Sequence, residues 1–277
     1  MRAVPDSLDP RVVRRVDARL DAVVRDERVA IPLAVESGSR AWGFPSPDSD
    51  YDCRFVHVRP RADYLDPWPR RDVVETPLDA VLDVNGWDLL KAVRLLVRGN
   101  ATVVEWLRSP IVYRGDAGFR ADLLDLAGRV VDPGDLSRHY RHLALGQRAR
   151  HDGATARLKT FFYVLRPVAA LGWLRAHDGA VAAPLELLTL LEESDAPGDV
   201  VRAATDLVAR KAVAREAGVA AVPPVLVRFV DAELDRAVPP TARRTDRADA
   251  RAVAAEAFRA ALDRYAPDVT PRPAATA

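Results

Sequence analysis

Two aspartates separated by a single residue, Asp50 and Asp52, are the part of the sequence whose spacing most directly suggests chemistry. Because side chains alternate along a strand, both carboxylates are expected on one face of the sheet. Two negative charges a few ångströms apart repel by roughly 3–4 kcal/mol at an effective dielectric constant near 20. Water, bases or divalent cations must offset that repulsion. The pair therefore predicts a site for Mg²⁺, which prefers oxygen ligands and bridges phosphate oxygens.

The residues around this pair strengthen the prediction, since aspartate is common in the chain and the spacing alone could arise by chance. A short apolar segment ends in the sequence Ser-Gly-Ser, which includes Gly38 and Ser39. Glycine permits close backbone approach, and backbone N–H groups at the start of a helix can hold a phosphate. Further along, Asp83 lies between apolar residues on a third predicted strand. It could bring a third carboxylate to the same edge.

Simpler interpretations of these residues stay open at this point. The paired aspartates could lie on a solvated edge strand with Arg54 as their counter-ion. Asp83 could be a turn residue, with Asp79 or Asp88 as the third ligand instead, although Asp88 is also a good helix cap. Ser39 could simply cap a helix.

Sequence periodicity predicts the elements that position these side chains. Asp9-Pro10 is typical of a helix start, and apolar residues then recur at helical spacing to about residue 27. Strands are expected over residues 30–37, 50–58 and 78–84, followed by helices over 87–98 and 100–109. Beyond residue 116 strand signals disappear, and helices are predicted near 116–130, 136–150, 154–177, 184–194, 198–217, 224–237 and 245–265.

Strands followed by a long run of helices indicate an α+β fold. We expect a small mixed-sheet head with flanking helices over residues 1–135 and an α-helical domain over 136–266. The tail, residues 267–277, is rich in Pro, Ala and Thr and is predicted to be disordered.

Composition sets outer limits on the function. The chain has 277 residues, with 49% hydrophobic and 29% charged, which is typical of a globular protein rather than a fibrous or disordered one. A net charge of +1 indicates no particular partner. The only cysteine, Cys53, excludes an internal disulfide and is expected to be buried on the face opposite the aspartates. With no apparent signal or membrane-spanning segment, a cytoplasmic location is expected.

Five segments together resemble a known family. The order of a strand, a Gly-Ser turn, an Asp-x-Asp strand and a later Asp-bearing strand resembles the DNA polymerase β nucleotidyltransferase superfamily. Within it the chain resembles RlaP, a bacterial and phage family of predicted nucleotidyltransferases associated with RNA ligase, over about residues 28–235. One departure is Leu90, where the family is expected to have Arg. The segments that carry the resemblance are Glu-Ser-Gly-Ser-Arg-Ala-Trp-Gly-Phe (36–44), Ser-Asp-Tyr-Asp (49–52), Gly-Trp-Asp-Leu-Leu-Lys-Ala (86–92), Glu-Trp-Leu-Arg-Ser-Pro (105–110) and Lys-Thr-Phe-Phe-Tyr-Val-Leu-Arg-Pro (159–167).

The resemblance implies a nucleotidyltransferase fold and transfer of a nucleoside monophosphate from an NTP to an acceptor hydroxyl, with release of pyrophosphate. Asp50, Asp52 and Asp83 would be the catalytic carboxylates and the ligands of two Mg²⁺ ions, for which Mn²⁺ could substitute. Asp83 would serve the ion that activates the acceptor hydroxyl.

The same resemblance places the triphosphate. Gly38 and Ser39 would bind its β- and γ-phosphates, and Arg40 would help to neutralise them. Lys159 and Arg166, seven residues apart and so on one helical face, could reach back from the helical domain and complete the NTP site. The alternative for this last pair is an ordinary solvated helix face.

The acceptor is less defined than the donor. An RNA end is one acceptor that fits the family, and a protein side chain or a small hydroxylated molecule is another. A catalytically idle NTP- or RNA-binding module is the alternative outside the enzymes. Residues 137–166 hold seven bases and one acid, a local charge of +6. Arg138, Arg141 and Arg148 share one helical face there and predict a phosphate-binding surface for RNA. The alternative is a solvated helix whose bases pair with acids from elsewhere in the chain.

Overall fold

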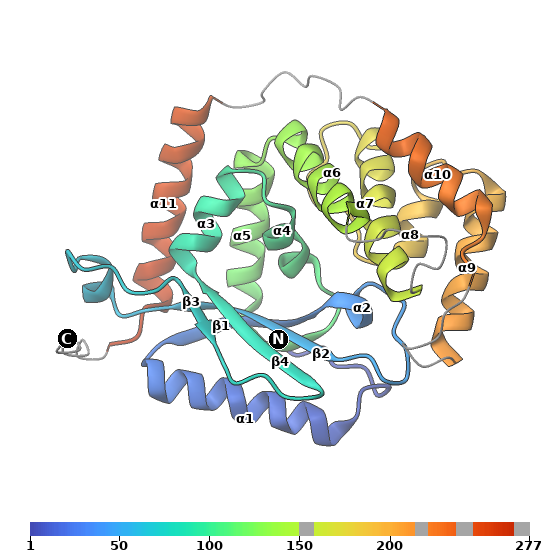
Figure 1. Cartoon of the computed structure of the whole chain (residues 1–277). Helices are drawn as coiled ribbons and strands as arrows, with labels where there is room; N and C mark the ends of the chain where they lie inside the picture. The colour runs from blue at the N-terminus through green and yellow to red at the C-terminus, as the bar shows by residue number, and fades with distance from the viewer. Residues whose placement is uncertain (150–157, 214–220, 237–245, 269–277) are drawn as a thin grey trace.

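A computed structural model describes residues 1–149, 158–213, 221–236 and 246–268. It confirms the α+β class. The sheet is mixed, with strand order β3-β4-β2-β1-β5, and helices cover both of its faces (Figure 1). Its strands are β1 (Ala30–Ser37), β2 (Tyr51–Val58), β3 (Val73–Glu75), β4 (Leu82–Asp88) and β5 (Val112–Gly115).

The central strand β2 runs parallel to its neighbour β4, and every other pairing is antiparallel. The third predicted strand begins later than expected, at Leu82 rather than residue 78. The reason is a local turn, because one Asp79 carboxylate oxygen accepts hydrogen bonds from the backbone N–H groups of Val81 and Leu82, both at 2.9 Å. The sequence did not predict β3 and β5, which are three and four residues long and lie at the sheet edges.

One face of the sheet is covered by α1 (Pro10–Glu27), where the sequence predicted a helix. Asp9 caps it by accepting a hydrogen bond from the Arg11 N–H, and proline occupies the first turn. The apolar stripe of the helix packs against a cluster that includes Cys53 and Phe55. Cys53 is fully buried on this side, as predicted. Each large apolar side chain buried in this way contributes roughly 1.5–3 kcal/mol.

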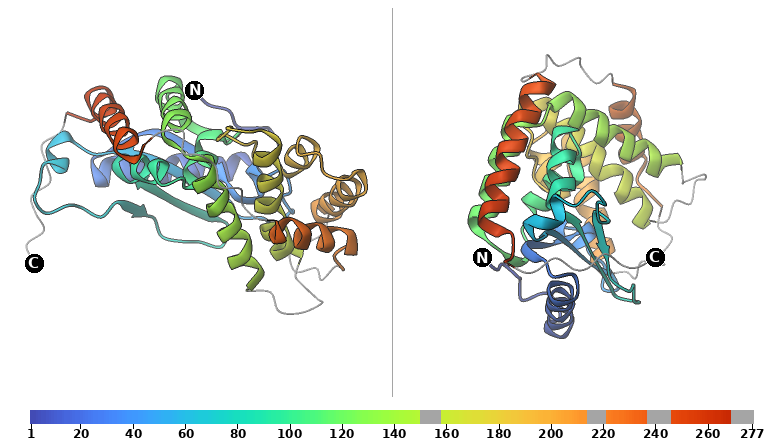
Figure 2. Two further views of the ribbon diagram at one scale, coloured as in Figure 1. Left: turned by 90° about the horizontal axis from the view of Figure 1, so that it is seen from above. Right: turned by 90° about the vertical axis from the view of Figure 1, so that its left-hand side faces the viewer.

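The opposite face carries the other helices, and the views in Figure 2 show them gathered on the side away from α1. A short turn of helix, α2 (Gly38–Ala41), follows β1. The long helix α11 returns from the end of the chain to lie beside α3 and α5. The remaining elements are the 3₁₀ turn η1 (Arg61–Tyr64), α3 (Leu89–Val97), α4 (Ala101–Arg108), α5 (Ala117–Val130), α6 (Pro133–Ala149), α7 (Leu158–Ala176), α8 (Leu187–Glu192), α9 (Gly198–Val213), α10 (Pro224–Asp235) and α11 (Arg247–Tyr265).

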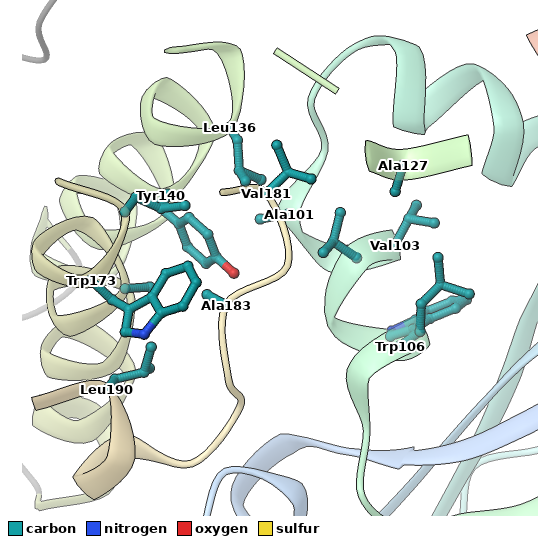
Figure 3. Close-up of a cluster of buried hydrophobic side chains, with 14 of the residues drawn as sticks. Ala101, Val103, Trp106, Ala127, Leu136, Tyr140, Trp173, Val181, Ala183 and Leu190 are labelled. Atoms are coloured by element: carbon teal, nitrogen blue, oxygen red, sulfur yellow. The ribbon is translucent and has the colours of Figure 1, made fainter. Parts of the chain in front are cut away.

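A single hydrophobic cluster extends from the sheet into the helical half. Figure 3 shows Trp106 and Val103 of α4 in the same cluster as Tyr140 of α6 and Trp173 of α7. Buried contacts therefore continue across residues 135 and 136. The division into a head and a helical domain stays a prediction, and the predicted disordered tail lies beyond residue 268 for the most part, outside the described residues. Among the described helices, none combines the length and apolar character needed to cross a membrane.

Candidate active site

Two of the three predicted carboxylates lie side by side at one end of the sheet. Asp52 near the start of β2 is the register partner of Asp83 near the start of β4. Their parallel pairing brings both side chains to the same edge, with 24% and 33% of the side chains exposed. A ligand can therefore reach both. The placement agrees with the sequence prediction, whereas the catalytic roles stay a prediction.

Arg54 bridges these two aspartates. One terminal nitrogen, Nη2, donates to Asp52 Oδ1 at 2.9 Å and to Asp83 Oδ2 at 2.7 Å. The other, Nη1, donates to the Asp83 backbone carbonyl at 3.1 Å. The side chain is 16% exposed. A guanidinium shared between two carboxylates offsets the like-charge repulsion between Asp52 and Asp83. Arg54 was considered as a counter-ion for Asp50 and Asp52, and here it pairs with Asp52 and Asp83.

Asp50 does not lie in the strand with Asp52, because β2 begins at Tyr51 and Asp50 is an exposed residue just before it. Its backbone carbonyl accepts a hydrogen bond from Arg40 Nε at 3.1 Å, while Arg40 Nη2 donates to the Ser49 carbonyl at 2.6 Å. The same guanidinium lies 3.9 Å above the centre of the Tyr51 ring. Arg40 thus holds the loop that presents Asp50. Contact with phosphates stays a prediction.

The Ser-Gly-Ser turn packs directly against Asp52. Gly38 has a left-handed φ of +65°, and a Cβ added there would lie 2.3 Å from Asp52 Oδ2. Only glycine allows this approach without displacing the carboxylate. The Ser39 hydroxyl is buried and donates to Ser49 Oγ at 3.1 Å, which ties the turn to the following loop. The position of the Asp52 carboxylate therefore requires a glycine here, and phosphate binding by Gly38 and Ser39 stays a prediction.

Glu36 is a component of the site that the residue-by-residue analysis did not single out. It is fully buried, and one of its oxygens accepts the Asp52 N–H at 2.8 Å, while the Tyr113 hydroxyl donates to the other. Burial raises the pKa of Glu36 to about 7, although the two hydrogen bonds and Arg40 act in the opposite direction. The signal in the sequence was a lone glutamate at the end of an apolar strand, just before Ser-Gly-Ser.

Arg166 points into the protein interior and does not point toward the aspartates. Its side chain is 3% exposed and donates from Nη1 to Glu105 Oε1 at 2.5 Å and from Nε to the Leu185 carbonyl at 3.0 Å. The guanidinium also lies 4.8 Å from the centre of the Trp42 ring. Glu105 thus holds this arginine in the core, although Arg166 Nη2 is buried there without a hydrogen-bond partner among the described residues. Contact between Arg166 and a triphosphate stays a prediction. Lys159 begins the same helix, and its side chain lies outside the described residues.

The sequence of this chain matches a known protein family over most of its length. A family model described as "RNA repair pathway DNA polymerase beta family", RlaP, matches residues 12–260. The chain belongs to the RlaP family. It is also 34% identical over 224 residues to the uncharacterized protein YcgL of Bacillus subtilis (strain 168), a match that covers 80% of this chain and 85% of that one. Membership of a polymerase β family supports a nucleotidyltransferase.

The carboxylates of this RlaP protein suit a divalent cation in their chemistry, since they are hard oxygen donors at a solvent-accessible edge. Within the described residues, however, no three acidic, histidine or cysteine side chains lie close enough together to form a metal site. Arg54 also takes one oxygen from each of Asp52 and Asp83. A cation and Arg54 would compete for the same oxygens.

The alternative third ligands of this RlaP protein are engaged elsewhere. Asp79 pairs with Arg19 of α1 at 2.6 Å and shapes the turn before β4. Asp88 is buried at the other end of β4, where it caps α3 and accepts a hydrogen bond from Tyr64 at 3.1 Å. Asp83 is the candidate that shares an edge with Asp52.

Proposed function

We propose that this protein is a Mg²⁺-dependent nucleotidyltransferase that moves a nucleoside monophosphate from an NTP to an acceptor hydroxyl. The acceptor oxygen attacks the α-phosphorus, the bond to the β-phosphate breaks, pyrophosphate leaves, and the hydroxyl proton passes to solvent. The observation that carries the proposal is the adjacent placement of Asp52 and Asp83, beside the Gly38 turn, in a chain of the RlaP family.

Asp50, Asp52 and Asp83 are the residues that would hold the Mg²⁺ or Mn²⁺ ions. When bound, such ions neutralise triphosphate charge and lower the pKa of the acceptor hydroxyl. Arg54 would have to exchange its bonds to Asp52 and Asp83 for other partners when an ion binds, and its guanidinium could then neutralise phosphate charge. Glu36 fixes the backbone at Asp52, so that this carboxylate enters the site at a defined position.

Binding of the triphosphate is assigned to Gly38 and Ser39, as the family resemblance implies. Gly38 already lies against Asp52, so phosphates held there would be close to a carboxylate that would hold the metal ion. Arg40 supports the same loop, and Lys159 stays a proposed contact from α7. Arg166 stays a proposed contact that would require its buried ion pair with Glu105 to open.

We propose an RNA end as the acceptor, since the family description refers to RNA repair. The alternatives are a protein side chain and a small hydroxylated molecule. An idle NTP-binding module is less well supported, because binding alone does not require two carboxylates converging on one edge. A cytoplasmic location stays a prediction from the sequence.

The test is to incubate the pure protein with each NTP radiolabelled at the α-phosphate, with Mg²⁺ or Mn²⁺ and total RNA. Labelled RNA would support the proposal in full. Labelled protein would keep the nucleotidyltransferase and reject the RNA acceptor. A second set of reactions replaces RNA with small hydroxylated molecules. If no reaction gives a labelled product or released pyrophosphate, with any NTP or either cation, the proposed transferase activity is rejected and the idle binding module remains.

A further inference from the structure

A groove of about 580 Å³ lies between α3 and α11, on the helix side of the sheet. The two helices run side by side in Figures 1 and 2. The groove is formed by two segments that are about 150 residues apart in the sequence, and the sequence alone did not predict that they meet. Its lining consists of Leu90, Val93, Arg94, Val97 and Arg98 from α3 and of Arg247, Arg251, Ala254, Ala255 and Phe258 from α11.

The charged part of this lining is entirely basic among the described residues. Arg94 and Arg98 are one helical turn apart on α3, and Arg247 and Arg251 are one turn apart on α11. All four are exposed. Like charges at this spacing destabilise a helix by roughly 0.2–0.5 kcal/mol per pair. Two such rows on facing helices therefore make a surface that a polyanion would stabilise.

Few acidic side chains compensate these charges. Arg94, Arg98 and Arg251 form no ion pair with any described residue, and Arg247 has only a long contact of 3.9 Å with Asp135. The α3–α11 groove thus keeps a net positive charge in a chain whose overall net charge is +1.

The floor of the α3–α11 groove is apolar. Leu90, at the position that departs from the expected family pattern, lies in it with Val93 and Phe258. The Phe258 ring is half-buried and packs edge-on against Tyr64, with ring centres 5.3 Å apart. Rows of arginines beside an apolar, partly aromatic floor suit a single nucleic-acid strand. The arginines can contact its phosphates, and the floor can contact its bases.

The surface that the sequence predicted for RNA is different and is less suitable. On α6, Arg138 is paired with Asp135, and Arg148 is paired with Asp231 at 2.6 Å. Arg141 donates to the Leu234 carbonyl at 3.1 Å. These contacts fit the alternative interpretation of this helix face, in which its bases pair with other groups of the protein. RNA binding by Arg138, Arg141 and Arg148 stays a prediction, and these arginines are already engaged.

The α3–α11 groove is also separate from the proposed NTP site. Asp83 lies near the start of β4, and α3 follows the other end of this strand. Seven residues of strand span about 20 Å at roughly 3.3 Å each. A ligand in the groove cannot be the NTP that binds at Asp52 and Asp83, whereas a strand of several nucleotides can reach both places.

We propose that the α3–α11 groove binds the single-stranded part of an acceptor RNA and delivers its end to the carboxylates. This rests on the proposed function for the choice of RNA as acceptor. The bases contact the apolar floor, and Arg94, Arg98, Arg247 and Arg251 contact phosphates.

The test measures binding of a fluorescent single-stranded oligoribonucleotide to the full chain at a series of salt concentrations, without NTP. The variant Arg94→Gln/Arg98→Gln/Arg247→Gln/Arg251→Gln should bind about tenfold or more weakly at low salt. Its log–log salt dependence should flatten by about 3 units, at roughly 0.7 per lost phosphate contact. The matched control is Arg138→Gln/Arg141→Gln/Arg148→Gln, which should change the slope by less than about one unit. Circular dichroism checks that both variants are folded.

Unchanged RNA binding in the groove variant, or a larger loss in the α6 control, would overturn the proposal. So would displacement of RNA by polyglutamate as effectively as by unlabelled RNA, since this would indicate a site for acidic protein. The readout needs no catalysis, so it separates failure of the groove from failure of the transferase. If transfer is then measured, the groove variant should lose activity toward a long RNA and keep it toward a dinucleotide.

Discussion

Two regions of this protein contain ion pairs between arginine and carboxylate side chains, and these pairs differ in their exposure to solvent. At the sheet edge, Arg54 bridges Asp52 and Asp83, and all three side chains are partly exposed. Between α4 and α7, Glu105 and Arg166 form an ion pair that is almost completely buried. An exposed bridge can exchange its partners for water or a ligand, whereas a buried pair is strongly constrained by the cost of leaving either charge alone. The difference in solvent exposure therefore indicates that the Arg54 bridge can take part in ligand binding, whereas the Arg166–Glu105 pair stabilises the fold.

Breaking the buried pair should have the largest effect on stability. Glu105→Ala leaves the Arg166 charge without its partner in the core, and we expect a loss of about 3–5 kcal/mol in the free energy of unfolding. Urea unfolding measures this loss. The double variant Glu105→Ala/Arg166→Met should recover most of it, because no charge is then left buried. A single variant within about 1 kcal/mol of the native protein would show that the pair is not buried as described.

Glu36 should give the protein a characteristic pH dependence. Its pKa in the folded state is about 7, above the ordinary value of 4.5, so the folded protein keeps a proton that the unfolded chain releases. Its contribution to stability is therefore fully present below about pH 4.5 and is lost as the pH rises through 7, by up to about 3 kcal/mol.

The variant Glu36→Gln tests this directly, since an amide keeps the acceptor oxygen for the Asp52 N–H and does not titrate. Urea unfolding at about pH 5 and about pH 8 should show a smaller loss of stability in the variant than in the native protein. Arg40, Tyr113, Asp52 and Cys53 surround the carboxylate in both proteins. Identical pH profiles would contradict the raised pKa.

Gly38→Ala should have an intermediate effect. The substitution adds strain at a left-handed φ, about 1–2 kcal/mol, and pushes a methyl group into the Asp52 carboxylate. Gly43→Ala is the matched control, because Gly43 has a φ of +82° and its added Cβ would meet nothing closer than 3.5 Å. Thermal unfolding should show a loss in both, larger in Gly38→Ala. Equal losses would mean that the contact between the turn and Asp52 is unimportant.

The smallest effect on stability is expected for Arg54→Gln, less than about 1 kcal/mol without divalent cations, because the bridge is partly exposed. The two freed carboxylates should then attract a cation more strongly, so that Mg²⁺ raises the melting temperature more in the variant than in the native protein. Arg114→Gln, which removes an exposed pair with Asp21, is the control and should not change the response to Mg²⁺. A weaker response in Arg54→Gln would reject competition between Arg54 and the cation.

Patterns in short stretches of sequence predicted those helices and strands that are determined by residues close together in the chain. The Asp9-Pro10 start and apolar spacing predicted α1, and alternation predicted β2, with the edge placement of Asp52 and Asp83 following from it. The short edge strands β3 and β5 were missed because pairing partners far along the chain define them.

Side-chain partners could not be predicted in the same way. Arg54 was considered as a counter-ion because it is two residues from Asp52, but the sequence did not show that it also reaches Asp83 on another strand. The helical spacing of Lys159 and Arg166 predicted a shared face, and this stays a prediction because the Lys159 side chain lies outside the described residues. The sequence could not show that Arg166 pairs with Glu105, which lies on a helix about sixty residues earlier.

The measurement that tests the central claim most directly is transfer of the labelled α-phosphate group by the native protein and by Asp52→Asn, in parallel with thermal unfolding of both. We expect the native protein to label its acceptor and the variant to be slower by at least about a hundredfold, because a carboxylate that would hold the metal is lost. The melting temperature should hardly change, since Arg54 keeps its bond to Asp83. A folded Asp52→Asn variant that transfers at a rate comparable with the native protein would contradict the assignment of this sheet edge as the active site.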